Sequence, residues 1–173
     1  MRKLVLVMLI LLGFSVMAAA QDTPAVELFG GYSFMRCDTD DEDVSCNLSG
    51  WNGAAAINGN RYVGAVVDFG GAYGDVDGSD LSIHTIMVGP RITFRTGRAT
   101  PFGQILMGNA RDSVEGVTTN RFAMSFGGGV DVNINDMIAI RPVQVEYLTI
   151  KVLGDYTDNM RYSAGVVFKL GSR

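Results

Sequence analysis

From about residue 25 onward, apolar residues alternate with small or polar residues with a period of two. The clearest run is 161–170, in which Tyr162, Val166 and Phe168 alternate with Arg161, Ser163 and Lys169. A period of two is typical of a β-strand that presents two different faces. Runs of about ten residues separated by turn residues are typical of membrane barrels. We identify eight such runs and predict strands at 26–35, 50–58, 62–73, 85–94, 100–110, 122–133, 137–150 and 161–170.

The segments between these runs alternate in length. Short turns are expected at 58–60, 96–99 and 133–136, whereas longer polar loops are expected at 37–49, 74–81, 111–120 and 151–159. Short turns on one side of a membrane and longer loops on the other are usual in outer-membrane barrels. The alternation predicts an even number of strands, with both chain ends on the side of the short turns.

The charged residues within the runs indicate which face of the sheet meets lipid. All of them lie on the face that carries the small residues: Glu27, Asp68, Arg91, Asp131, Glu146, Arg161 and Lys169. A soluble barrel would turn this face to water and would pack the aromatic face into a narrow interior. In a membrane barrel the aromatic face meets lipid instead, and closure satisfies every backbone group. We therefore predict an all-β fold, a closed antiparallel eight-stranded transmembrane up-and-down β-barrel.

The interior of an eight-stranded barrel is just wide enough for side chains to fill it. We predict a polar network there, and no open pore for solutes the size of a sugar. This network is either a structural plug or a narrow path for ions or protons. In run 100–110 the inward set is Phe102, Gln104, Leu106 and Gly108, whereas a bulge expected at Pro142 leaves the orientation of Arg141 open. The predicted network comprises Asp68, Arg91, Asp131, Gln144, Glu146, Arg161 and Lys169.

The first twenty residues have the features of a secretory signal peptide. Arg2 and Lys3 precede the apolar run 4–17, and the small residues 18–20 suit cleavage before Gln21. The apolar run is too short to span a bilayer as a helix, which needs roughly 20 residues. We assign residues 1–20 to the signal peptide and 21–173 to one barrel domain. Export to an oxidising compartment makes a disulfide between Cys37 and Cys46 the expected state, with free surface thiols as the alternative.

Three features suggest other chemistry. His84, the only histidine, lies near Ser79, Asp80 and Ser82, but its parity turns it toward lipid and no nucleophile turn accompanies it. We expect an interfacial histidine rather than a catalytic one. A loop with five carboxylates, which lacks the EF-hand spacing, is expected to be solvated rather than to bind Ca²⁺ or Mg²⁺. The net charge of −4 argues against nucleic acid as a partner. The acidic loop residues are Asp38, Asp40, Asp41, Glu42 and Asp43.

Several short motifs, taken in order, resemble the OmpA-type eight-stranded outer-membrane β-barrel domain family. They include Gly30-x-Tyr32-Ser33, Val145-Glu146-Tyr147 and Ser163-Ala164-Gly165-Val166, and the resemblance spans residues 25–171. It implies an outer-membrane barrel without the peptidoglycan-binding domain that follows the barrel in longer members. The family's C-terminal aromatic is replaced here by Gly171-Ser172-Arg173, so that assembly signal is imperfect.

Together these features predict a non-enzymatic integral outer-membrane protein with a structural or narrow-pore, porin-like role. One alternative is a surface binding or adhesion module that acts through the external loops. The other is a rim enzyme that modifies lipid A. The expected partners are outer-membrane lipid, lipopolysaccharide and, during biogenesis, the barrel-assembly machinery. We expect a monomer with no cofactor and no metal ion.

Overall fold

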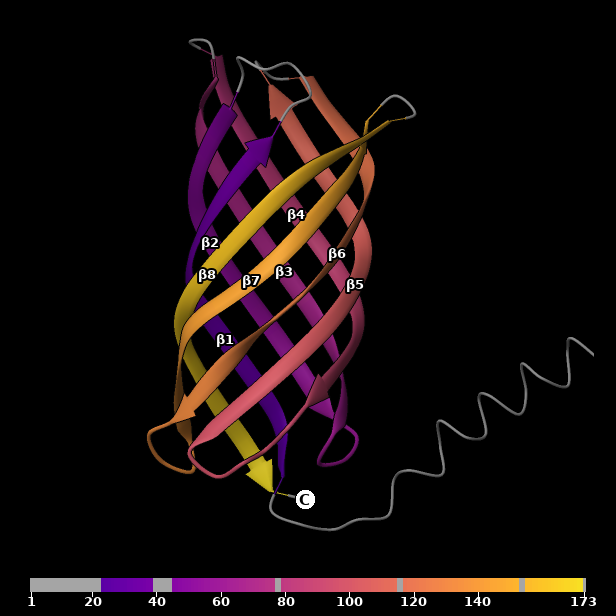
Figure 1. Cartoon of the computed structure of the whole chain (residues 1–173). Coiled ribbons are helices and arrows are strands. Elements are labelled where there is room, and N and C mark those ends of the chain that lie inside the picture. Colours follow the sequence, from indigo (N-terminus) through magenta and orange to yellow (C-terminus); the bar gives the residue numbers. More distant parts are fainter. Residues whose placement is uncertain (1–22, 39–44, 77–78, 115–116, 153–154, 173) are drawn as a thin grey trace, which may run out of the picture.

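The computed structural model describes residues 23–38, 45–76, 79–114, 117–152 and 155–172. Figure 1 shows long strands that tilt around a common axis. Their bounds are β1 Pro24–Asp38, β2 Ser45–Asn58, β3 Val63–Val76, β4 Ser79–Thr93, β5 Ala99–Val114, β6 Val117–Asn133, β7 Ile138–Val152 and β8 Asp155–Ser172.

Each strand pairs antiparallel with its neighbours in the chain, and β1 also pairs with β8 to close the barrel. The pairing of β1 with β8 runs from Pro24 opposite Ser172 to Asp38 opposite Asp158. This confirms the predicted closed eight-stranded up-and-down barrel. Within the described residues, no helix has the length and apolar character needed to cross a membrane.

The outer surface of the barrel is apolar over most of its height. The exposed large apolar side chains come from all eight strands and include Tyr32, Trp51, Phe69, Ile86, Ile105, Phe126, Val143 and Phe168. On β4 and the residue that follows it, this face runs from His84 to Phe94, about 33 Å at about 3.3 Å per residue. A strand tilt of about 40° reduces this to about 25 Å, the height of the apolar band in outer-membrane barrels. The predicted assignment of the two faces is therefore correct.

The strands are longer than predicted at the end of the barrel that lies away from the termini. β3 reaches Val76 and β4 begins at Ser79, so the loop expected at 74–81 is wrong. The same holds for 111–120, where β5 ends at Val114 and β6 begins at Val117, and for 151–159, where β7 ends at Val152 and β8 begins at Asp155. The backbone ladder continues above the apolar band into segments whose sequence is mostly polar, so the alternation ends before the strands do. We call this end the outer mouth, and the end at which β1 begins and β8 ends the inner mouth.

β7 carries the irregularity expected at Pro142. Arg141 lies opposite Gly165 and Gln144 opposite Ser163, so two residues of β7 face the single Ala164 of β8. Such a bulge reverses the alternation of side chains along one strand. As a result Arg141 and Gln144, three residues apart, are both buried inside the barrel. The orientation of Arg141, which the sequence left open, is inward.

Two glycines allow β1 and β8 to approach closely. Gly31 lies opposite Gly165 on the inward face, and a Cβ at Gly31 would lie only 2.8 Å from the carbonyl carbon of Ala164. No side chain fits at such a distance without a shift of the backbone. Glycine at position 31 is therefore required by the seam that closes the barrel.

Candidate functional site

An arginine bridges two buried carboxylates in the interior of the barrel. Arg161 of β8 donates from Nη2 to Asp68 Oδ1 at 2.8 Å and from Nε to Glu146 Oε2 at 2.8 Å. All three side chains are almost completely buried. Asn52 donates to the second oxygen of Asp68 at 2.9 Å, and Gln104 donates to the second oxygen of Glu146 at 2.8 Å. Five strands thus contribute to one network, which we call the ionic layer.

A second ion pair extends the ionic layer toward the inner mouth. Arg141 donates two hydrogen bonds, of 2.6 and 3.0 Å, to Asp131 and one of 2.6 Å to Gln144. Its guanidinium also lies 4.3 Å from the ring centre of Phe29 and 4.2 Å from that of Phe102. A bidentate pair with aromatic contacts is the arrangement that best compensates a buried arginine for lost water. The bulge at Pro142 makes this pair possible because it turns Arg141 inward.

A third group of charged residues lies at the inner end of this layer and contains fewer carboxylates than guanidinium groups. Glu27 lies 2.8 Å from Arg95 and 3.8 Å from Arg91, so one carboxylate pairs with two guanidinium groups. Arg91 also donates to Gln104 Oε1 at 2.8 and 3.0 Å and lies over the ring of Phe102. Positive charge therefore exceeds negative charge at this level of the barrel.

Apolar side chains fill much of the lumen on the side of the ionic layer that faces the outer mouth. This apolar layer is drawn from several strands, and its larger members are Met35, Leu48, Ile83, Met87, Leu106, Leu148 and Ile150. Leu48, Leu106 and Leu148 are fully buried. Sequence reasoning placed Leu106 inward but overlooked the layer as a whole, although its members share the parity of the inward charges.

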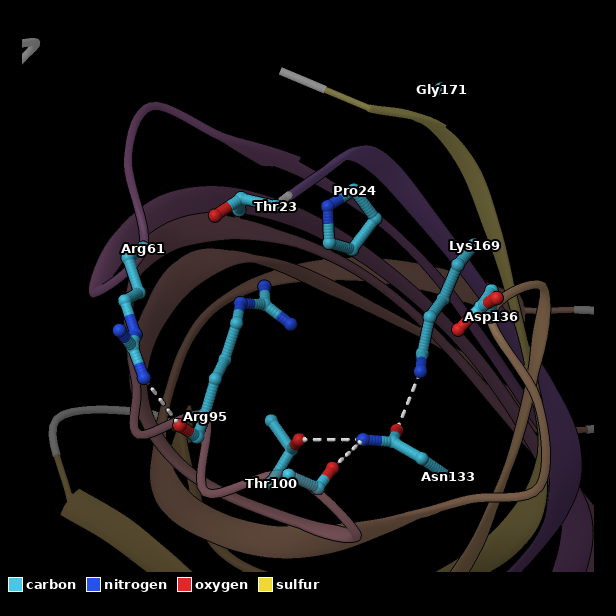
Figure 2. A pocket seen from close by; sticks show the side chains of 10 residues that line it. Thr23, Pro24, Arg61, Arg95, Thr100, Asn133, Asp136, Lys169 and Gly171 are labelled. Atoms are coloured by element: carbon cyan, nitrogen blue, oxygen red, sulfur yellow. Dashed lines mark hydrogen bonds between the residues drawn. The ribbon is translucent and has the colours of Figure 1, made fainter. Parts of the chain in front are cut away.

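The inner mouth holds a cavity of about 820 Å³ (Figure 2). Arg61, Arg95 and Lys169 point into it, and Lys169 Nζ donates to Asn133 Oδ1. Arg61 comes from the turn after β2 and donates to the carbonyl of Arg95 at 3.0 Å. Arg95 follows β4 and shares its inward parity, a signal that could have included it in the predicted network. The remaining lining residues are Thr23, Pro24, Gly97, Thr100, Asp136 and Gly171.

His84 lies on the outer surface, in a cluster near the upper edge of the apolar band. Its Nε2 is 3.0 Å from the hydroxyl of Tyr73, to which Trp51 Nε1 donates at 3.3 Å. The rings of Tyr73 and His84 meet edge to face, with centroids 5.5 Å apart. Tyrosine and tryptophan at such a height are typical of the belt at a membrane interface. The histidine faces the surroundings of the barrel, as its parity predicted.

The structure places the predicted site residues in different regions of the barrel. Six of the seven network residues are buried within the lumen, and Lys169 stands at the inner mouth. Cys37 is disulfide-bonded, and its partner in the strand register is Cys46. Asp38 ends β1, whereas Asp40, Asp41, Glu42 and Asp43 lie outside the described residues. Among the described residues, no group of three metal-ligating side chains is suited to hold a metal ion.

Solved structures with the same architecture come from several bacteria. Neisserial surface protein A superposes with a TM-score of 0.72 at 14% identity, covering 84% of this chain and 97% of that one. Ail, the attachment invasion locus protein of Yersinia pestis, gives 0.61 at 17% identity, covering 86% and 100%. The N-terminal β-barrel domain of Pseudomonas aeruginosa OprF gives 0.53 at 13% identity, covering 86% and 98%. At these sequence identities the similarity shows a shared fold.

The family follows from the sequence itself. No curated protein matches the chain significantly. The family model described as outer membrane protein beta-barrel domain matches residues 6–169, which is most of the chain. With the closed barrel and its apolar outer band already established, the chain belongs to the family of outer membrane protein β-barrel domains.

Proposed function

We propose that this outer-membrane barrel has a structural, non-enzymatic role and that its lumen is closed to ions and solutes. The observation that carries the proposal is the filling of the lumen by two successive layers of side chains. One layer is ionic and the other is apolar, and they oppose conduction for different physical reasons.

The ionic layer opposes conduction because its charges are already engaged with one another. Arg161 holds Asp68 and Glu146, and Arg141 holds Asp131. A passing ion would have to break charge-assisted hydrogen bonds between groups that are almost completely buried. The cavity beside Arg161 measures about 10 Å³, close to the space that one water molecule needs.

The apolar layer opposes conduction because it offers an ion no ligand. Apolar constrictions exclude water and so act as closed gates in channels. Leu48, Leu106 and Leu148 come from three different strands and are fully buried. An ion that reached the ionic layer from the outer mouth would first have to lose its hydration shell among these side chains.

Conductance in planar bilayers tests this proposal. We expect no current steps from the wild-type barrel, and none from the variant Asp68→Ala/Glu146→Ala/Arg161→Ala, because the apolar layer still seals the lumen. Adding Leu48→Ser and Leu148→Ser to that variant should produce current. Heat-modifiable gel mobility establishes that each variant is folded. Discrete steps from the wild-type barrel would overturn the proposal and favour a narrow pore.

The surroundings of His84 support a non-enzymatic role. Its Nε2 lies within hydrogen-bond distance of the phenol of Tyr73, and it stands at the level of the aromatic belt rather than in a cleft. We expect His84→Gln to leave the mass spectrum of lipid A unchanged in cells that express the protein. A loss of one lipid A species in that variant would indicate a rim enzyme.

The same reasoning extends to export and to partners. We propose cleavage before Gln21, delivery by the barrel-assembly machinery and residence as a monomer surrounded by lipid and lipopolysaccharide. Monomeric residence is supported by the closed sheet, which leaves no strand edge for a second copy. N-terminal sequencing of the membrane form tests the cleavage site, and a start other than Gln21 would contradict it.

A further inference from the structure

The inner mouth combines a cavity with a surplus of positive charge. Arg61, Arg95 and Lys169 line a space of about 820 Å³, within the range of small-molecule sites in proteins. Asp136 is the one acid among the lining residues, and Glu27 beneath them is shared between Arg91 and Arg95. The whole chain nevertheless has a net charge of −4, so this local excess runs against the overall balance.

The donors in this cavity converge from separate elements. Figure 2 shows the guanidinium of Arg95 and the ammonium of Lys169 directed toward the same hollow, from opposite walls. The hydroxyl of Thr100 and the amide of Asn133 lie between them and bond to each other at 3.4 Å. The Asn133 amide already donates to the carbonyl of Gly97 and to Thr100 Oγ1, so the guanidinium groups, the ammonium and the Thr100 hydroxyl are the donors that suit an anion with several oxygen atoms.

Arg95 retains a hydrogen-bonding position that its neighbours do not use. Its side chain is 14% exposed, and its Nη2 lies 2.8 Å from Glu27 Oε1. Its Nε has no hydrogen-bond partner among the described residues. The same atom is shielded from solvent, so a ligand in the cavity would meet the exposed part of the guanidinium instead.

We propose that the inner mouth is a binding site for a small, water-soluble anion that bears phosphate groups. Guanidinium forks favour phosphate oxygens, and the cavity is large enough for more than one such group. Lys169 and Arg95 lie on the inward face of the wall, so the ligand enters from the aqueous side rather than from the bilayer. This site goes beyond the structural role of the closed lumen, because binding at the mouth requires no passage through the barrel.

The test uses pyrophosphate as the probe and the isotope-labelled full barrel in a zwitterionic detergent. We expect saturable shifts of the backbone amides of Gly97, Asn133 and Lys169, while those of Gly74 and Ala110 near the outer mouth stay unchanged. Raising the salt concentration should weaken binding, since screening acts on contacts that water reaches. No saturable shift at the inner mouth would overturn the proposal.

Matched variants distinguish binding at a specific site from a general effect of positive charge. Arg95→Gln and Lys169→Gln should each weaken binding of pyrophosphate about tenfold or more, the loss expected for one hydrogen bond between charged groups. Arg98→Gln removes the same charge from the same turn at an exposed position outside the lining, and should change affinity less than about twofold. Equal losses in all three variants would refute a specific site. Lys169→Gln leaves the pair of Glu27 and Arg95 intact, so it decides the question if Arg95→Gln does not fold.

A second arm identifies the source of the phosphate. Bicelles with phosphatidylglycerol present the same phosphate chemistry on a lipid. We expect them to leave the amides of the inner mouth unchanged and pyrophosphate to shift them. Shifts from the lipid alone would overturn the assignment to a soluble ligand.

Discussion

Replacement of Arg161 by methionine should destabilise the barrel by about 3–5 kcal/mol. The side chain makes charge-assisted hydrogen bonds to Asp68 and Glu146, whose carboxylates are both completely buried. Each hydrogen bond to a charged group contributes about 1.5–3 kcal/mol, and breaking a buried ion pair costs about 3–5 kcal/mol because a charge is left without compensation. Methionine conserves much of the volume, so the loss reports mainly on charge.

The neutral combination separates charge from packing. In Asp68→Asn/Glu146→Gln/Arg161→Met no buried charge remains in the triad, and stability should return to within about 2 kcal/mol of the wild type. Arg161→Lys keeps the charge without the planar guanidinium, and its stability should lie between those of Arg161→Met and the triple variant. The free energy of unfolding is measured in urea with the barrel inserted in lipid vesicles. An Arg161→Met variant as stable as the wild type, or a triple variant less stable than Arg161→Met, would contradict this expectation.

Three further outcomes follow from the geometry. Gly31→Val should lower the free energy of unfolding by more than about 2 kcal/mol, because its side chain meets the backbone of β8; a neutral effect would contradict the close seam. Deletion of Pro142 should separate Arg141 from Asp131 and lower the temperature at which the heat-modifiable band is lost, whereas Pro142→Ala should not. The emission of Trp51, the only tryptophan, should be quenched more strongly by nitroxide labels at lipid headgroups than by labels deep in the acyl chains.

The alternation of residues was sufficient to predict the strands and the orientation of their faces. Inside the apolar band one face meets lipid and the other a packed lumen, so parity is visible in runs such as 122–133 and 161–170. Above the band the sequence is mostly polar, so the continuation of β5 through Arg111 to Val114 left no clear alternation of apolar and polar residues. The ladder continues there because backbone pairing does not depend on the side chains.

The interior was predicted in part. Asp68, Glu146 and Arg161 followed from parity alone, whereas Arg141 did not, because the bulge that turns it inward depends on how β7 pairs with β8. The cavity at the inner mouth was not predicted, because Arg61 and Lys169 come from segments far apart in the sequence. Only closure of the barrel brings them to one space.

A membrane barrel requires the apolar side of the sheet to meet hydrocarbon, and carbene photolabelling from a lipid-dissolved probe tests this most directly. Peptide mapping of the labelled barrel in native-like bilayers should find adducts at outward residues such as Ile105, Phe126 and Phe168, and none at Asp68 or Asp131. Adducts on these aspartates, with the outward residues unlabelled, would show that the charged face of the sheet, and not the apolar face, meets lipid.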